Sequence, residues 1–167
     1  MRKDGTTLKD LMNRQTQSGE VVYISIRPKR RQPPEEISHV FADASHGLRG
    51  DHYGGGPDGK RQVTLINEEH IRAVASFVGE AVLAPGLLRR NIVVRGINLL
   101  SLKDKEFSIG EAVFRMTGLC HPCSRMEENL GEGGYNAMRG HGGITAAIIE
   151  GGWIRKGDSI SLIMNEI

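Results

Sequence analysis

The two cysteines of this 167-residue chain, Cys120 and Cys123, lie in one short segment, LCHPCSRM. Such a pair suits several kinds of chemistry: a disulfide, half of a zinc site, a dithiol redox pair, or one metal-ligating cysteine with a neighbour. A disulfide here would close a very short loop and constrain the unfolded chain little. The segment MRKDGTTLKDLMNRQTQSGE has no apolar signal region, so we expect a cytoplasmic protein, in which structural disulfides are rare.

Two alternatives to a metal-ligating cysteine stay open. Structural zinc needs four ligands, commonly from two paired clusters, and the sequence has no second CxxC and no HxxxH pair. A non-catalytic zinc-binding or interaction module would have to assemble its other ligands in space. A CxxC dithiol redox protein of the thioredoxin type needs a strand before the pair and an alternating βαβ pattern, and only the strand is indicated.

The residues around the cysteines are polar, which is untypical of a buried core strand. Ser124 and Glu127 follow the pair, and Arg125 places a positive charge two residues after Cys123. A neighbouring cation favours the thiolate form of cysteine, which is the form that binds metals and attacks electrophiles. This flank favours chemistry at the thiols over a purely structural role.

A glycine-rich loop, GLRGDHYGGGPDGKRQ, precedes a predicted strand. It is neither a Walker A motif nor a dinucleotide fingerprint, because the required spacings are absent. Its bare backbone allows a ligand to approach closely, and Arg49, Lys60 and Arg61 are available to bind an anion. A mobile hairpin connection is the alternative interpretation of this loop taken alone.

A second basic segment, LLRRNIVVRG, places Arg89, Arg90 and Asn91 directly before a strand. Arginine offers paired donors for a phosphate or a pterin ring, so the segment suits a clamp at a barrel rim. Without further context the same residues are equally compatible with a solvated strand edge.

Short runs rich in β-branched residues must position these side chains, and they predict a mainly β fold. Strands are expected at Val21–Arg27, Ile37–Ala42, Gln62–Ile66, Asn91–Arg95, Leu99–Leu102, Glu106–Ile109, Ala112–Leu119, Ile144–Glu150 and Ser159–Met164. Two connections, FSIGEAVFRM and IRKGDSISLI, turn at a glycine followed by an acid. Many short strands favour a closed or nearly closed β-barrel with a few helices over a parallel α/β sheet.

Helices are expected at few places. Asn67 can cap a helix that runs to Gly79, with acids in its first turn and apolar residues at helical spacing. A minor helix is expected between Ser124 and Arg139. Residues 1–19 are predicted to form a polar leader or peripheral helix, with a short turn at Thr7–Asn13, and residues 20–167 to form one domain.

Composition excludes some classes of function. The net charge is +2 and aromatic residues make up 5% of the chain, which does not suit nucleic-acid binding. No apolar run approaches the roughly 20 residues that span a bilayer. We therefore expect a small-molecule ligand and neither nucleic acid nor membrane as a partner, while the oligomeric state stays undetermined.

Four segments in this order resemble the MOSC domain, the C-terminal domain of molybdenum cofactor sulfurases: GLRGDHYGGGPDGKRQVTLI, PGLLRRNIVVRGINLLSL, FSIGEAVFRMTGLCHPCSRM and GGITAAIIEGGWIRKGDSISL. The resemblance runs from Gly19 to the C-terminus and is to the small stand-alone bacterial and archaeal type. It implies a β-rich barrel with a few helices, in agreement with the strand pattern.

The resemblance also implies binding of the molybdenum cofactor, a molybdopterin that bears a phosphate. The hallmark cysteine of the family ligates molybdenum in some relatives and is proposed to carry sulfur in others. It corresponds to Cys123, with Cys120 supporting it or forming a reversible bridge with it. A thiolate is a soft ligand suited to a sulfur-rich metal centre.

Other signature residues of the family map onto the basic segments. The arginine-any-asparagine pattern that helps bind the cofactor corresponds to Arg89, Arg90 and Asn91, although many relatives have glutamate at the middle position. Asp51 and Arg61 match the GD…RQ signature. The implied activities are reduction of N-hydroxylated substrates with an electron-donor partner, or delivery of sulfur or cofactor to a recipient protein.

Overall fold

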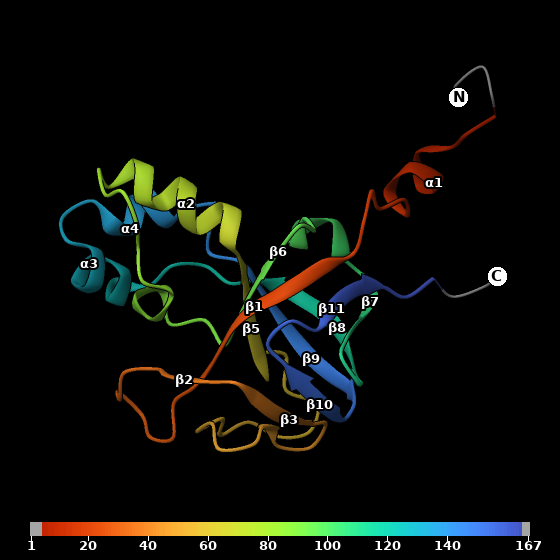
Figure 1. Ribbon diagram of the computed structural model, residues 1–167, viewed down its shortest axis with the longest axis horizontal. Coiled ribbons are helices and arrows are strands. Elements are labelled where there is room, and N and C mark those ends of the chain that lie inside the picture. Colours follow the sequence, from red (N-terminus) through yellow and green to blue (C-terminus); the bar gives the residue numbers. More distant parts are fainter. Residues whose placement is uncertain (1–4, 165–167) are drawn as a thin grey trace.

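Seven strands close into a barrel in the computed structural model, which describes residues 5–164 (Figure 1). In order around the barrel they are β11 (Ser159–Leu162), β7 (Glu106–Ile109), β8 (Ala112–Leu119), β9 (Ile144–Glu150), β5 (Val63–Asn67), β6 (Ile92–Arg95) and β1 (Gly19–Ile26). The pairing of β11 with β1 closes the ring. Neighbouring strands are antiparallel except β5 and β6, which are parallel. Because the ring is closed, each of the seven strands pairs with a neighbour on both sides over at least part of its length.

Four further strands extend the barrel on one side. The strand β2 (Glu35–Ile37) pairs with the end of β1. A small antiparallel sheet joins β10 (Gly152–Arg155), β3 (His39–Asp43) and β4 (Gly47–Leu48). The chain from β1 to β5 thus leaves the barrel, forms β2, β3 and β4 and returns, and β10, which follows β9, completes the small sheet.

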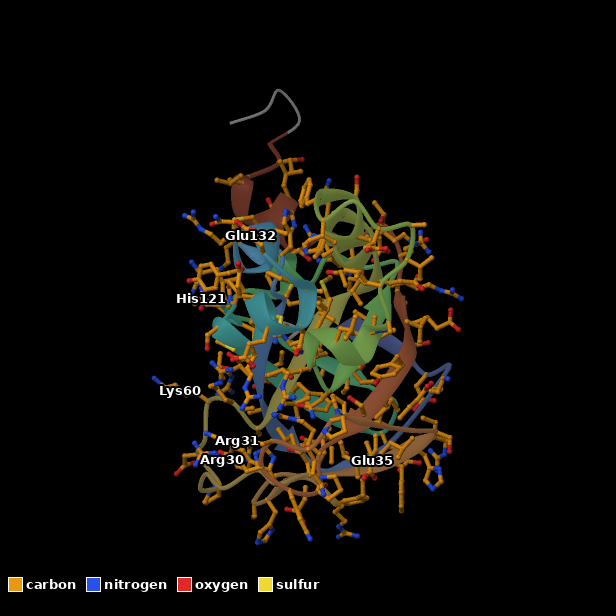
Figure 2. The ribbon with its side chains drawn as sticks, turned by 90° about the vertical axis from the view of Figure 1, so that its left-hand side faces the viewer. Arg30, Arg31, Glu35, Lys60, His121 and Glu132 are labelled. Atoms are coloured by element: carbon orange, nitrogen blue, oxygen red, sulfur yellow. The ribbon has the colours of Figure 1, made fainter. Side chains whose placement is uncertain are left out.

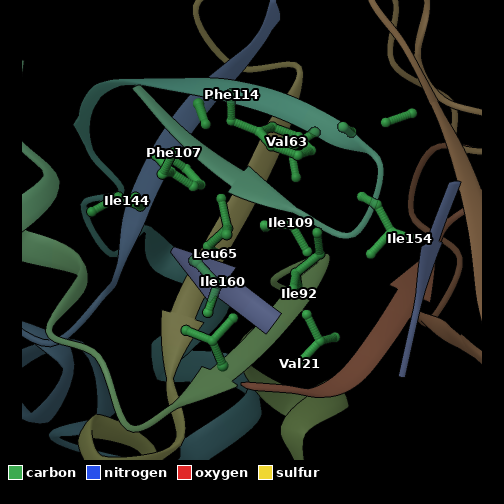
Figure 3. Packing of buried hydrophobic residues seen from close by; sticks show 14 of the residues in the cluster. Val21, Val63, Leu65, Ile92, Phe107, Ile109, Phe114, Ile144, Ile154 and Ile160 are labelled. Carbon is green, nitrogen blue, oxygen red and sulfur yellow. The ribbon is translucent and has the colours of Figure 1, made fainter. Parts of the chain in front are cut away.

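Apolar side chains alternate along the strands and fill the barrel interior (Figure 3). Along β7 and β8, Phe107, Ile109, Ala112 and Phe114 point inward and are fully buried. Phe107 and Phe114 are cross-strand partners, and their rings stack with centroids 5.6 Å apart. The interior is therefore a packed hydrophobic core.

Helices cover one side of the barrel, at the upper left of Figure 1. They are α2 (Glu68–Phe77), the 3-10 helix η1 (Pro85–Leu88), α3 (Ser124–Leu130) and α4 (Gly134–Met138). A second apolar cluster, which includes Tyr23, Ile71, Val93 and Met126, packs these helices against the outer face of the strands. The short helix α1 (Leu8–Met12) has no buried residue and lies apart from this layer.

The predicted fold class is confirmed, but the strand expected at Leu99–Leu102 is wrong. This segment is a 3-10 helix, η2. Leu99 and Leu102 are both buried, whereas Leu100 is exposed, so the apolar spacing is three residues and not two. The Asn98 side chain also accepts a hydrogen bond from the Leu100 amide, which starts the helical turn.

Other boundaries differ from the expectations in smaller ways. The helix after Asn67 forms, but the Asn67 side chain does not cap it; it donates to the Ile97 carbonyl and accepts from the Leu99 amide. The predicted minor helix is two helices, α3 and α4. The turn at Gly110 joins the paired strands β7 and β8, whereas the turn at Gly157 joins strands of different sheets. No helix of residues 5–164 is long and apolar enough to cross a membrane.

Candidate functional site

Strand pairing fixes the relative positions of the segments that carry the candidate residues. Ile24 near the end of β1 is paired with Ile92 at the start of β6, and Leu65 of β5 is also paired with Ile92. Leu119 at the end of β8 faces Ile144, which in turn pairs with Leu65. Side chains of the segments that follow β1 and β8 and of those that precede β5 and β6 meet at one cavity.

A cavity of about 320 Å³ lies at this meeting point, and we call it the arginine-lined cavity. Seven arginines line it, and no aspartate or glutamate is among the described residues of its wall. The lining residues are Arg27, Arg30, Arg31, His52, Arg61, Thr64, Arg89, Arg90, Cys120, Cys123, Arg125 and Met126. Such a concentration of guanidinium groups attracts an anionic ligand.

Both cysteines line this cavity, but their surroundings differ. Cys120 follows β8 directly, is 2% exposed, and donates its backbone N–H to the Gly143 carbonyl at 2.9 Å. The guanidinium of Arg61 donates to its Sγ at 3.7 Å. Cys123 is exposed and stands at the N-cap of α3, and both thiols are free. Cys123 is thus the thiol open to the cavity and Cys120 the buried one.

Arg90 is a buried arginine whose donors bind backbone carbonyls. It is 7% exposed; Nε donates to Gly142 at 2.7 Å, Nη1 to Leu88 at 2.8 Å and Nη2 to Cys120 at 3.4 Å. Burial lowers the pKa of this guanidinium from its ordinary value, while the two cysteines act in the opposite direction. Arg90 therefore ties the η1 turn, the Gly142 loop and the Cys120 segment together.

Arg89 faces the cavity from a strained backbone. Its φ of 58° and ψ of 32° are left-handed, a region that residues with a Cβ rarely adopt outside special sites. Burial lowers the pKa of its guanidinium, and the nearby charges of Arg27 and Arg125 lower it further. The structure thus keeps like charges close together at this point, which an anion would relieve.

Asn91 and Asp51, both predicted to contact a cofactor, lie outside the cavity wall. The Asn91 Oδ1 accepts from the backbone and the hydroxyl of Thr64, and its amide donates to Ser25. The Asp51 carboxylate accepts from the Arg27 amide at 2.8 Å. Each therefore positions a neighbour that does line the cavity. Arg49, also considered for an anion, stacks over Phe41 away from this site.

Six cavity residues were not identified from the sequence: Arg27, Arg30, Arg31, His52, Thr64 and Met126. Arg30 and Arg31 belong to the run KRRQPPEE, whose three consecutive basic residues indicate a charged surface but match no binding motif. His52 donates its backbone N–H to the Arg27 carbonyl, so it fixes the start of this loop. Its Nδ1 is buried without a hydrogen-bond partner among the described residues.

A glutamate of α3, the helix whose N-cap is Cys123, joins this helix to α4. Glu127 accepts from the amides of Gly133 and Tyr135 at 2.7 and 2.8 Å, which joins α3 to α4. These two backbone hydrogen bonds lower the pKa of the Glu127 carboxyl. The cavity-facing Arg125 forms an ion pair with Glu128 at 3.5 Å. His121, between the cysteines, is exposed and lies at the edge of the molecule in Figure 2.

The donor set fits a ligand that brings its own metal better than a bare ion. Within residues 5–164 no group of three or more His, Cys, Asp or Glu side chains could bind a metal. That finding weighs against the zinc module, because structural zinc takes four protein ligands. A single open thiol beside several guanidinium groups fits a group that combines a soft metal centre with a phosphate.

Comparisons with known proteins agree with this fold. The family model of the MOSC domain matches residues 39–161. The solved structure of YuaD from Bacillus subtilis is similar with a TM-score of 0.75 at 20% identity, covering 86% of this chain and 94% of that one. No curated protein matches the sequence at a significant level.

Two further solved structures are of YiiM. The protein from Geobacillus stearothermophilus has a TM-score of 0.72 at 16% identity, covering 87% of this chain and 75% of that one. The protein from Escherichia coli has a TM-score of 0.67 at 17% identity, covering 88% and 71%. At these identities the likeness supports the fold alone.

Proposed function

The chain belongs to the MOSC domain family, and we propose that its arginine-lined cavity binds a molybdenum cofactor with the Cys123 thiol directed at the metal. One observation supports the proposal above others. Seven arginines and both cysteines of the chain, drawn from four separate segments, line the same cavity. A phosphate-bearing, sulfur-rich metal group is well matched by this combination of cations and soft donor.

Some residues of the site bind the ligand in this proposal, and others fix the shape of the cavity. Arg61 and Arg89 present guanidinium donors to an anion, and Thr64 and Met126 form part of the wall beside them. Arg90 and Asn91 bind backbone and neighbouring side chains, so they fix the shape of the cavity. Asp51 holds the Arg27 backbone. Arg125 lies two residues beyond Cys123 on the first turn of α3.

Cys123 is the residue we assign as metal ligand or sulfur carrier. Its side chain is exposed, so a ligand can reach the sulfur without moving the barrel. Cys120 is 2% exposed, and Arg61 already donates to its sulfur, so it supports the site from behind. When bound, the cofactor supplies two-electron redox chemistry at molybdenum.

Two activities are consistent with such a site. One is reduction of an N-hydroxylated substrate, in which two electrons and two protons convert the N–OH group to N–H and water. It requires an electron-donor protein, because the sequence contains no flavin or iron–sulfur motif. The other is delivery of cofactor or sulfur to a recipient protein. In both cases the protein acts in the cytoplasm.

Metal and pterin content tests the proposal. Protein purified anaerobically from a host that makes the cofactor is expected to contain molybdenum and pterin in equal amounts. Cys123→Ser is expected to lose most of the molybdenum, whereas Cys120→Ser keeps it. Absence of both metal and pterin from the wild type would sink the proposal, and the reverse result for the two variants would move the ligand to Cys120.

A dithiol redox role is the second candidate, favoured by one local feature. The CxxC segment lies between the end of β8 and the start of α3, the strand-to-helix position that such pairs occupy. Oxidation would form one Sγ–Sγ bond and pass two electrons and two protons to a disulfide oxidant. This role requires both cysteines equally and predicts an oxidised form that thioredoxin reduces.

A further inference from the structure

The arginine-lined cavity contains more positive charge than a single phosphate group can match. Of its seven arginines, Arg125 alone forms an ion pair with a carboxylate of the described residues. Arg90 uses its donors on three carbonyls. Arg27, Arg30, Arg31, Arg61 and Arg89 form no ion pair within residues 5–164. These five residues leave an excess of positive charge around one cavity, which the Glu128 carboxylate near Arg89 offsets only in part.

The arginines occupy two zones. The inner zone is defined by Arg61 and Arg90, which hydrogen-bond to the sulfur and the carbonyl of the buried Cys120. The outer zone is defined by Arg30 and Arg31, which are exposed residues of the loop after β1. Figure 2 shows Arg30 and Arg31 together at one edge of the molecule, with Lys60 above them. The two zones belong to different segments and face the same cavity.

Backbone strain marks the same side chains. Only three described residues other than glycine have a positive φ, and two of them are cavity arginines: Arg31 at 67° and Arg89 at 58°. A strained backbone persists where surrounding structure or function requires it. A loop whose only task were to connect β1 and β2 could have glycine or asparagine at position 31 instead.

We infer that the cavity binds a ligand with two linked phosphate groups, and this inference rests on the proposed cofactor site. A phosphate monoester carries a charge of about −1.5 to −2 and accepts paired donors from few guanidinium groups. Arg61 and Arg89, which line the cavity and form no ion pair within the described residues, suffice for one such group. The outer zone then matches a second phosphate, which places a diphosphate ester across the cavity mouth. A pterin with a diphosphate bridge to another organic group has this chemistry.

Titration with simple anions tests the inference. Protein from a host that does not make the pterin is titrated by calorimetry with inorganic pyrophosphate and inorganic phosphate at constant ionic strength. We expect pyrophosphate to bind about tenfold or more tightly, as one additional bidentate contact would give. The double variant Arg30→Gln/Arg31→Gln should lose this preference while its affinity for phosphate changes by less than about twofold.

A matched control separates a site from a general effect of charge. Arg72→Gln/Arg115→Gln removes two positive charges outside the cavity, at residues paired with Glu68 and Glu106, and should keep the full preference for pyrophosphate. Equal affinity for the two anions in the wild type would overturn the inference. The same holds for a preference that survives in the cavity double variant, or that the control loses equally.

The titration is independent of the proposed function. It uses no molybdenum and no pterin, so pyrophosphate preference can be present in a protein that proves to contain neither. Conversely, a protein that contains molybdenum and pterin but shows no preference for pyrophosphate retains the proposed function and loses only the diphosphate inference.

Discussion

The inner wall and the outer rim of the arginine-lined cavity differ in burial and in whether their polar groups already have hydrogen-bond partners. On the inner wall, Arg90 and Cys120 are buried, and the guanidinium, the amide and the sulfur all have partners. On the outer rim, Arg30, Arg31 and Cys123 are exposed, and neither arginine has an acidic partner among the described residues. Polar groups that already have partners keep the shape of a site, whereas groups without partners are available to a ligand.

Adjacent residues in the sequence can belong to the two classes. Arg89 and Arg90 are the same residue type one position apart, but Arg90 is 7% exposed and bonded to three carbonyls, whereas Arg89 is half-buried and faces other cations. The left-handed backbone at Arg89 turns the chain so that its side chain faces the cavity. The inner wall should therefore control stability and the rim should control binding.

Replacing Arg90 is the strongest test of this difference. Arg90→Met leaves the carbonyls of Leu88, Gly142 and Cys120 with fewer donors, and we expect a loss of about 2–3 kcal/mol in unfolding free energy. Relief of the buried charge offsets part of the cost. Arg89→Met should change stability by less than about 0.5 kcal/mol. Urea unfolding monitored by circular dichroism measures both changes in stability. Equal losses in the two variants would contradict the assignment of Arg90 to stability and Arg89 to binding.

Gly142 offers a second test on the same wall. A Cβ at this position would lie 2.0 Å from the Cys120 carbonyl oxygen, so Gly142→Ala must displace that backbone. We expect a loss of about 1–3 kcal/mol, and greater accessibility of the Cys120 thiol to alkylating reagents.

Gly56→Ala is the matched control, because a Cβ there meets no atom within 4 Å and the residue has no positive φ. It should be neutral within about 0.5 kcal/mol. If Gly142→Ala changed the unfolding free energy and the alkylation of Cys120 as little as this control does, the inner wall would accommodate an added methyl group. Its hydrogen bonds would then not make it rigid.

Much of the fold follows from sequence pattern, because alternation along short strands specifies a buried face. The strands near Val63, Phe107, Phe114 and Ile144 were predicted from short runs rich in β-branched residues, and each contributes to the barrel core. The segment Leu99–Leu102 was misassigned, since four residues are too few to separate a spacing of two from a spacing of three. The short strand β10 was missed because glycines precede it and a tight turn follows.

Site residues were predicted only where a local motif indicated them. The cysteines and Arg61, Arg89, Arg90 and Arg125 were identified and do meet at one cavity. Arg27, Arg30 and Arg31 were not, because their position depends on which end of β1 lies beside β6, and strand pairing is not encoded locally. The sequence likewise gives no means to separate Arg89 from Arg90, since burial and backbone conformation make the difference.

A change to acid pH is expected to have the smallest effect, because it acts on histidines behind the inner wall and not on the wall itself. The His70 ring on α2 packs edge-to-face on His141 with centroids 5.1 Å apart, and His141 precedes the two glycines whose carbonyls bind Arg90 and Cys120. Burial lowers the pKa of His70 below its ordinary 6.5, and the neighbouring His141 lowers it further, against an opposing effect of Glu69. The unfolded chain therefore takes up a proton at a higher pH than the folded protein does.

Stability from this contact is present above pH 6.5 and is lost as the pH falls through the folded-state pKa of His70. Urea midpoints measured between pH 7.5 and pH 5 should accordingly fall less steeply for His70→Gln than for the wild type. Parallel curves for the two proteins would show that His70 titrates alike in both states. In that case protonation of His70 does not weaken the loop that binds Arg90 and Cys120 through Gly142 and Gly143. The rigid part of the inner wall would then include the contact between His70 and His141.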